Sequence, residues 1–262
     1  MLAFGEGAVL RNECVIRLRD VSKCFASGPE TVHALKPASL TLDRGEFVLL
    51  EGPSASGKTT LLSIMGLLLR PTQGQVEICG TPVSHLSEER LPDFRLRHIG
   101  LIPQTYNLFA ALSAIDNIKL ILKLKGYSWN ERRKEAPVLL ERVGLGDCMY
   151  RKPADLSGGQ RQRICIARAL AGESDVILAD EPTAALDTKT GIEIIELLRD
   201  EARSGRKAVL VVTHDPRLEK YATRLDRITD GQLAVGSPIN WRGAIENTRP
   251  ISGLHPPELA RY

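Results

Sequence analysis

The sequence predicts an α/β protein whose core is a mostly parallel sheet, with an antiparallel β part and an inserted helical subdomain. Two apolar runs, EFVLLE at 46–51 and DVILAD at 175–180, have the length and composition of buried central strands. Between them the pattern becomes mostly helical at about 85–172, and alternating strand and helix patterns return afterwards. The predicted core is therefore built from two separate parts of the chain, with the helices as an excursion.

Composition narrows the class of protein. The 262 residues can form one large domain or two small ones with a full hydrophobic core. With 35 Lys and Arg against 32 Asp and Glu, the net charge is only +3, and no basic stripe with interleaved aromatics indicates a nucleic-acid partner. Five scattered cysteines without a CxxC pair are typical of reduced thiols in a cytosolic protein. No signal peptide is indicated, and the most apolar segment, 61–69, is far shorter than the ~20 residues of a membrane helix.

The first part of the predicted core follows a loose lead-in at 1–12. A helix is expected from near Gly57 to about Leu69, where Pro71 ends it. Strands are predicted for the alternating or continuous apolar runs at 15–21, 39–43, 46–51 and 75–79.

The middle part contains one short strand, at 98–104, and otherwise helices. Ser-x-x-acid patterns at 113–116 and 128–131 predict two helices that begin with capping boxes. GLGD at 144–147 closes the second of these, and a third helix runs to about Ala171.

The second part of the core begins with the strand at 175–180. A helix at 188–205 and a strand at 208–213 follow, and Asp215-Pro216 predicts the start of a short helix. Asp230-Gly231 predicts a hairpin within 224–235. These elements place the domain at 13–235, with its core at about 13–84 and 173–235, its helical subdomain at about 85–172, and a loosely ordered tail at 236–262.

GPSASGKT at 52–59 fits the phosphate-binding pattern G-x-x-x-x-G-K-[ST], with a buried strand before it and a helix after it. Backbone N–H groups of such a loop wrap phosphate, Lys58 bridges the β- and γ-phosphates, and Thr59 offers a hydroxyl to Mg²⁺. A Gly/Ser turn that carries a lysine by chance is the alternative. The candidate nucleotide-binding residues are Gly52, Pro53, Ser54, Ala55, Ser56, Gly57, Lys58, Thr59 and Thr60.

DVILADEP supplies the partner element of this loop. The strand places Asp180 at its carboxyl end, the ligand-binding edge of an open α/β sheet, where the carboxylate is a candidate Mg²⁺ ligand. Glu181 follows directly and is a candidate general base for the attacking water. A strand end followed by an ordinary turn is the alternative interpretation.

A second anion-friendly helix start lies at LSGGQ, residues 156–160. Ser157 can cap the helix, and the two glycines allow a ligand to approach the backbone closely. LSGGQ together with both phosphate-loop motifs, in this order and spacing over about residues 14–235, resembles the ATP-binding subunits of ABC transporters. A purely structural cap at Ser157 is the alternative.

The resemblance implies a P-loop NTPase of the ABC ATPase type that hydrolyses ATP with Mg²⁺. It implies that two copies pair head to tail, so that the signature residues of one copy close on the phosphate held by Lys58 of the other. The signature residues that then join the nucleotide site are Ser157, Gly158, Gly159 and Gln160.

Further roles come from the resemblance alone. Gln104 is implied to bind Mg²⁺ and to link ATP to the helical subdomain, and His214 is implied to act with Glu181 in hydrolysis. Phe25 is implied to stack on adenine, with a buried core phenylalanine as the alternative. Two departures from the family pattern are Ala55, where glycine is usual, and Phe25, where tyrosine is common.

Within the family, 86–118 and the residues around LSGGQ and DEPTAALD are similar to the lipoprotein-release and macrolide-export ATPases. That branch implies an integral-membrane permease, through it a periplasmic adaptor, and a peripheral position on the cytoplasmic face of the inner membrane. The expected work is export or extraction of a lipid, lipoprotein or drug-like substrate. The alternative is regulation of a membrane-anchored periplasmic activity without cargo. Leu108 and Phe109 are expected to form part of the socket for the permease, with packing inside the helical block as the alternative.

Overall fold

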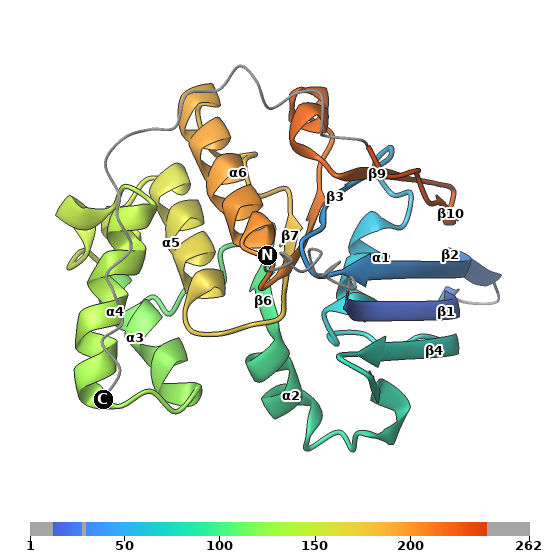
Figure 1. The fold of residues 1–262 in the computed structure, drawn as a ribbon, viewed down its shortest axis with the longest axis horizontal. Helices are drawn as coiled ribbons and strands as arrows, with labels where there is room; N and C mark the ends of the chain where they lie inside the picture. Colours follow the sequence, from blue (N-terminus) through green and yellow to red (C-terminus); the bar gives the residue numbers. More distant parts are fainter. Residues whose placement is uncertain (1–12, 28–29, 240–262) are drawn as a thin grey trace, which may run out of the picture.

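The computed structural model describes residues 13–27 and 30–239, and these residues form two sheets and the helices around them (Figure 1). The larger sheet has the order β10-β9-β3-β8-β7-β6, and only β10 runs antiparallel to its neighbour. This confirms the mostly parallel core. Its strands are β3 (Phe47–Glu51), β6 (Ile99–Ile102), β7 (Val176–Asp180), β8 (Ala208–Val212), β9 (Arg224–Thr229) and β10 (Gln232–Ala234).

The smaller sheet is antiparallel, in the order β2-β1-β4-β5. Two of its strands are longer than the predicted 15–21 and 39–43, because register shifts interrupt the alternation and the side chains near the hairpin tip, such as Phe25 and Val32, are exposed. A hydrophobicity pattern does not report strand residues of that kind. The strands are β1 (Cys14–Ser27), β2 (Glu30–Asp43), β4 (Gln73–Ile78) and β5 (Thr81–Pro82).

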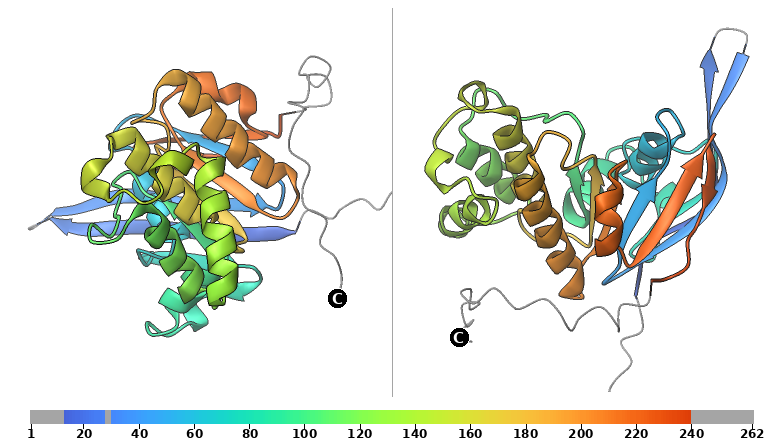
Figure 2. Two further views of the ribbon diagram at one scale, coloured as in Figure 1. Left: turned by 90° about the vertical axis from the view of Figure 1, so that its left-hand side faces the viewer. Right: turned by 90° about the horizontal axis from the view of Figure 1, so that it is seen from above.

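The larger sheet separates two hydrophobic clusters. Along β3, Phe47 and Leu49 belong to one cluster, whereas Val48 and Leu50 belong to the other. Helices α3 (Ala114–Leu124), α4 (Trp129–Arg142), α5 (Gly158–Leu170) and α6 (Thr188–Arg203) contribute to the first cluster. Helices α1 (Lys58–Met65) and α2 (Leu91–His98) and the antiparallel sheet contribute to the second. Figures 1 and 2 show these two layers on opposite sides of β3 and β7.

Helix α1 is shorter than predicted, because it ends at Met65 and not near Leu69. Leu67 takes the left-handed conformation at φ 55°, which closes the helix four residues before Pro71. This Schellman motif usually has glycine at the left-handed position, so the leucine hid the helix end from the sequence analysis. Its two hydrogen bonds run from Leu67 N to Ile64 O (3.1 Å) and from Leu68 N to Ser63 O (2.8 Å).

The predicted helix starts in the middle of the chain are confirmed. Ser113 caps α3, and Ser128 caps α4 in a complete capping box with Glu131. The predicted strand at 98–104 is the shorter β6, and it is the edge strand of the larger sheet beside β7. The purely helical part of the excursion therefore begins after β6, and the domain boundaries stay a prediction.

The elements after β7 follow the prediction closely. Asp215 caps the 3-10 helix η4 (Pro216–Tyr221), and Asp230 and Gly231 have φ values of 47° and 73° in the turn between β9 and β10. The predicted lead-in at 1–12 and residues 240–262 of the predicted tail at 236–262 lie outside the described residues. Across the described part of the chain, no helix has the length and apolar character that a membrane crossing requires. The short 3-10 helices elsewhere are η1 (Val83–His85), η2 (Gly146–Cys148) and η3 (Pro153–Asp155).

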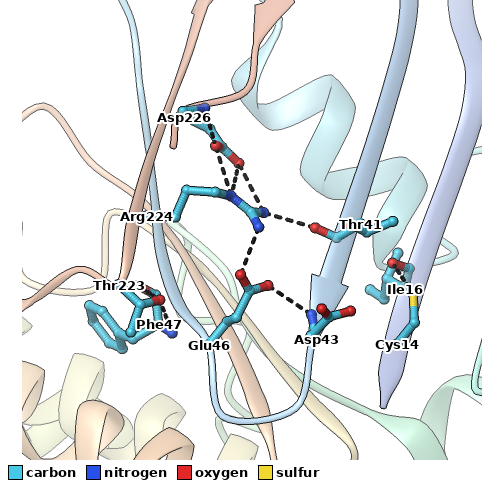
Figure 3. A network of polar contacts seen from close by, with 10 residues as sticks. Cys14, Ile16, Thr41, Asp43, Glu46, Phe47, Thr223, Arg224 and Asp226 are labelled. Atoms are coloured by element: carbon cyan, nitrogen blue, oxygen red, sulfur yellow. Dashed lines mark hydrogen bonds and ion pairs between the residues drawn. The ribbon is translucent and has the colours of Figure 1, made fainter. Parts of the chain in front are cut away.

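A buried charge network ties β9 to the turn between β2 and β3 (Figure 3). Arg224, 6% exposed, bonds to Asp226 at 3.0 Å, to Glu46 at 2.7 Å and to the carbonyl of Thr41 at 2.8 Å. Burial raises the pKa of Glu46, although Arg224 opposes that shift. Asp226 also accepts from the backbone N–H of Gly236, so the network fixes the chain where it leaves β10.

Candidate nucleotide site

The carboxyl ends of four parallel strands meet at one edge of the larger sheet. The phosphate loop begins after β3 at Gly52, and Gln104 is exposed just after β6. Asp180 ends β7, Glu181 follows it, and His214 comes shortly after β8. Because these strands are parallel neighbours, the fold gathers residues that lie up to 162 positions apart in the chain (52 to 214).

Two glycines of the phosphate loop are required by the surrounding backbone. A Cβ on Gly52 would lie 2.1 Å from the carbonyl oxygen of Ile228. A Cβ on Gly57, which has φ 106°, would lie 2.4 Å from that of Ala34. The turn between β9 and β10 holds the loop from outside, because Gly231 N donates to the carbonyl of Ser56 at 2.9 Å. Sequence analysis identified that turn as a hairpin and missed its role in supporting the loop.

The loop contains one strained residue. Ala55, where glycine is usual in the family, has φ 62°, a left-handed conformation that a Cβ disfavours. The sequence marked Ala55 only as a departure from the family pattern, and the positive φ is seen in the structure alone. The loop keeps its shape because the strand, the helix and the hairpin turn fix it on all sides.

The helix start fits a phosphate group. Helices α3, α4, α5 and α6 each have a side-chain cap, whereas no side chain caps α1, so its first N–H groups are free of such a partner. Ser56 Oγ is buried in the loop without a hydrogen-bond partner among the described residues. The oxygens of a phosphate group would accept hydrogen bonds from the uncapped N–H groups of α1 and from the Ser56 hydroxyl. The positive end of the helix dipole also favours an anion at this position.

Lys58 places its charge over the loop. Its Nζ donates to the carbonyls of Gly52 at 2.8 Å and Pro53 at 2.7 Å. The neighbouring Pro53, Ser54 and Ala55 are exposed, and Thr60 is half-buried. The loop therefore presents an ammonium group and uncapped amides to one region of space.

Thr59 and Asp180 join the loop to β7. Thr59 Oγ1 donates to Asp180 Oδ2 at 3.0 Å, and Asp180 is 6% exposed. Burial raises the pKa of Asp180, and the charge of Glu181 adds to this, while the bond from Thr59 and the charge of Lys58 oppose it. A hydroxyl and a carboxylate in contact form the kind of oxygen pair that Mg²⁺ prefers, so these residues fit the ion.

Glu181 and His214 form the second polar pair of this edge. Glu181 Oε1 lies 2.7 Å from His214 Nδ1. The hydrogen bond to Glu181 and the charge of that carboxylate raise the pKa of His214. Glu181 has φ 49°, and its N–H donates to the carbonyl of Val212 at 3.0 Å, so the adjacent strand β8 fixes its backbone.

The signature residues start α5 with a capping box. Ser157 Oγ accepts from Gln160 N at 3.2 Å, and Gln160 Oε1 accepts from Ser157 N at 2.9 Å. Both glycines have close neighbours. A Cβ on Gly158 would lie 3.0 Å from the hydroxyl of Tyr106, and a Cβ on Gly159 would lie 3.0 Å from the carbonyl oxygen of Ala185. Tyr106 is a supporting residue that the sequence analysis missed, because no local pattern marks it.

The structure does not bring the signature residues to the phosphate loop of the same chain. Helix α1 packs in the cluster on one face of the larger sheet, through residues such as Leu61 and Ile64. Helix α5 packs in the cluster on the other face, through Ile164 and Ile166. The sheet therefore separates the two helices (Figures 1 and 2).

Phe25 lies on the β1–β2 hairpin and is 42% exposed, with Lys23 Nζ 5.2 Å from the centre of its ring. The alternative that it is a core phenylalanine is therefore wrong. Its exposed ring is free to stack on a base, and that role stays a prediction.

A phosphate loop between a buried strand and a helix, next to an acidic strand end, defines a P-loop nucleotide-binding protein. Residues 35–184 match the family described as ABC transporter. The chain is 47% identical to an uncharacterized ABC transporter ATP-binding protein of Thermotoga maritima, over 88% of this chain and 97% of that protein. The chain belongs to the ABC transporter family, and it is an ABC-type ATPase.

Other relatives are longer. The macrolide export ATP-binding/permease protein MacB of Hyphomonas neptunium is 42% identical over 85% of this chain, which spans only 34% of that relative. A similar protein of Yersinia pestis is 41% identical over 87% of this chain and 34% of its own length.

Among solved structures, the ATP-binding cassette MJ0796 has the same fold. Its dimer in a post-hydrolysis state bound to ADP and Pi has a TM-score of 0.79 and 39% identity, over 84% of this chain and 98% of that one. A second dimeric structure of MJ0796, described as a bacterial ABC transporter cassette, has a TM-score of 0.80 and 40% identity over the same shares.

Proposed function

We propose that this ATPase drives a transport step by closing as a head-to-tail dimer on ATP. The observation that carries the proposal is the separation of α1 and α5 by the larger sheet, since one chain cannot close its own signature residues on its own phosphate loop. The two structures of MJ0796 are described as dimeric, which supports the pairing of two copies.

Nucleotide binding is assigned to the loop from Gly52 to Thr60. The uncapped amides of α1 bind the β-phosphate, and Lys58 moves from its two carbonyl partners to the β- and γ-phosphates. Phe25 stacks on adenine, because its ring is exposed on the neighbouring hairpin.

Mg²⁺ is assigned to Thr59 and Asp180, with Gln104 as a third ligand from the end of β6. When bound, the ion supplies charge neutralisation at the phosphates. Asp180 contributes a carboxylate that is already oriented by its bond to Thr59.

Hydrolysis is assigned to Glu181 and His214. Glu181 accepts a hydrogen bond from the attacking water and polarises it, and the imidazole of His214 holds the carboxylate in place. Lys58 stabilises the charge of the transferred phosphoryl group, so catalysis consists mainly of positioning and charge stabilisation.

The partner copy completes the site with Ser157, Gly158, Gly159 and Gln160. In the capping box the Ser157 hydroxyl accepts through its oxygen, so its own proton stays available to donate to the γ-phosphate. The capping function that was the alternative interpretation is thus present and compatible with a role across the dimer.

The transport partner is an integral-membrane permease, as the name ATP-binding/permease of the MacB relatives supports. Phe109 is 49% exposed and belongs to its socket, whereas Leu108 packs against the first hydrophobic cluster and supports it from inside. Buried Asn117 shapes the loop that carries Phe109, because its side-chain oxygen accepts a hydrogen bond from Phe109 N at 2.9 Å.

The cargo is a lipid, lipoprotein or drug-like molecule. A periplasmic adaptor acts through the permease, and the ATPase lies on the cytoplasmic face of the membrane.

The test measures the mass of purified Glu181→Gln by light scattering, with and without Mg-ATP. A monomer that becomes a dimer only with Mg-ATP is expected, because the variant binds ATP without hydrolysing it. Glu193→Gln, an exposed position of α6, is the matched control and should hydrolyse ATP like the unchanged protein. A Glu181→Gln protein that binds ATP and stays monomeric, alone and with permease, would overturn the proposal.

A further inference from the structure

Three potential metal ligands meet at the amino edge of the larger sheet, opposite the phosphate loop. Cys79 follows β4, His98 ends α2 just before β6, and Asp175 directly precedes β7. One ligand atom from each lies within 4.8 Å of the others. His98 Nδ1 and Asp175 Oδ2 are already 2.6 Å apart. A thiol, an imidazole and a carboxylate from three different elements therefore face one point.

We propose that Cys79, His98 and Asp175 form a binding site for a thiophilic divalent cation of the Zn²⁺ class, with a fourth position open to water. Zn²⁺ binds these three ligand types tetrahedrally with bonds of about 2.0–2.3 Å, which sets the ligand atoms roughly 3.3–3.8 Å apart. The three ligand atoms lie within 4.8 Å of one another, so Cys79 must approach the other two, and the His98–Asp175 pair at 2.6 Å must open by about 0.7 Å. Mg²⁺ requires oxygen ligands, so this site is distinct in chemistry from the one at Asp180.

The backbone at Cys79 determines where its thiol lies. Cys79 and Gly80 form the turn between β4 and β5 with φ values of 48° and 74°. Such turns favour asparagine, aspartate or glycine at the first position, because a Cβ is disfavoured at positive φ. The turn between β4 and β5 fixes the backbone of Cys79, whose sulfur lies within 4.8 Å of a ligand atom of His98 and of Asp175.

Arg44 holds the carboxylate of the cluster in place. Its Nη2 pairs with Asp175 Oδ1, which leaves Oδ2 for His98 or for a cation. The same guanidinium pairs with Glu13 at 2.9 Å, so its charge is shared between two carboxylates. Partners of this type orient metal-binding carboxylates from behind.

An entry path lies beside the cluster. A cavity of about 710 Å³ is lined by His98, Asp175 and Arg44 together with residues of α4 and α6. From this cavity an ion would first meet His98 and Asp175, and Cys79, which does not line it, would complete the site behind them. Once bound, the ion would link β4 of the smaller sheet to α2 and to β7 of the larger sheet.

The test uses Co²⁺ as a spectroscopic probe on the full chain without nucleotide. One equivalent should give a thiolate-to-cobalt charge-transfer band and the intense visible bands of a four-coordinate site. Cys79→Asn should abolish the charge-transfer band while it keeps a residue that the turn favours, so the variant is expected to fold. His98→Gln should weaken Co²⁺ binding at least about tenfold, as loss of a ligand does.

The matched control is Cys24→Ser. Cys24 Sγ lies 3.2 Å from His33 Nδ1, so this is a second thiol–imidazole pair and the direct rival for the cation. The band should survive Cys24→Ser, and Zn²⁺ should raise the melting temperature of this variant but not that of Cys79→Asn. Absence of the band in the unchanged protein, its persistence in Cys79→Asn, or its loss in Cys24→Ser would each overturn the proposal.

Discussion

At the scale of single residues, the edge that carries the phosphate loop is controlled by short contacts between neighbouring strand ends. Glu181 is held by its backbone bond to Val212 and by its side-chain bond to His214. The side chain of Asp180 is held by a hydrogen bond from the Thr59 hydroxyl. Each orientation depends on a residue that is adjacent in space and distant in the chain: Val212 and His214 for Glu181, and Thr59 of α1 for Asp180.

The first residue-scale prediction concerns the pH dependence of His214. Its pKa should lie above the ordinary value of about 6.5, because Glu181 accepts a hydrogen bond from the ring and carries negative charge. Glu181→Gln should return the pKa towards 6.5. An NMR titration of the histidine Cε1 protons measures this, with His214→Gln to assign the signal.

The sign of the stability effect follows from that shift. Because the folded-state pKa of His214 is raised, its contribution is fully present below pH ~6.5 and is lost as the pH rises through the folded-state pKa. Glu181→Gln should remove this pH dependence. Asp215→Asn is the control and should shift the pKa less, since Asp215 is a weaker cause than Glu181. An unchanged titration of His214 in Glu181→Gln would contradict the assignment.

The second residue-scale prediction concerns Ala55. Relief of the left-handed alanine should gain about 1–2 kcal/mol, and the added chain entropy of glycine should cost about 0.5–1 kcal/mol. Ala55→Gly should therefore raise the free energy of unfolding by roughly 0.5–1 kcal/mol, measured by urea denaturation. Ala184→Gly, at an exposed position without positive φ, should lower it instead. Destabilisation by Ala55→Gly would show that the loop is not strained at this residue.

At the scale of elements, helix ends and buried charges fix how the parts are joined. Helices α1 and α2 begin without a side-chain cap, whereas α3 to α6 each have one, and of the two uncapped starts only that of α1 follows the phosphate loop. The Arg224 network fixes β9, and β9 in turn leads to the turn that supports the phosphate loop.

The element-scale prediction tests that network. Arg224→Met should lower the free energy of unfolding by about 3–5 kcal/mol, because it leaves buried Asp226 and half-buried Glu46 without their cation. Arg227→Met on the same strand removes an ion pair to Glu51 whose arginine is 65% exposed, and should cost less than about 1 kcal/mol. Urea denaturation compares the two variants, and equal losses would argue against the importance of the network.

At the scale of the whole molecule, the larger sheet places the phosphate loop and the signature residues on different faces. In the proposed head-to-tail dimer, each copy would therefore carry halves of two different sites. This arrangement can be tested by mixing two defective variants, since a composite site can be rebuilt only from separate copies.

Mixing Lys58→Ala with Ser157→Arg should restore ATP hydrolysis, although each variant alone is inactive. In a random mixture half of the dimers are mixed, and one of their two sites is intact, so about a quarter of the sites should work. Lys58→Ala mixed with Glu181→Gln is the control. Both residues belong to the same half of the site, so this pair should stay inactive. No recovery in the first mixture would contradict the head-to-tail arrangement.

The sequence predicted elements best where the signal is local. The apolar strands β3, β7 and β8, the caps at Ser113 and Ser128 and the Asp230-Gly231 turn depend on neighbouring residues, and all were predicted. The long β1–β2 hairpin and the early end of α1 were missed. Exposed side chains at the hairpin tip and a leucine in a position that favours glycine gave no such signal.

By itself, the sequence determined the class of the protein, because the phosphate loop and LSGGQ are short motifs whose chemistry requires those residue types at that spacing. Only the tertiary structure decided the strain at Ala55, the exposure of Phe25 and the meeting of Cys79 with His98 and Asp175. It also decided that α1 and α5 lie on opposite faces of the larger sheet. These features come from contacts between residues far apart in the chain, and no local pattern of side chains encodes such contacts.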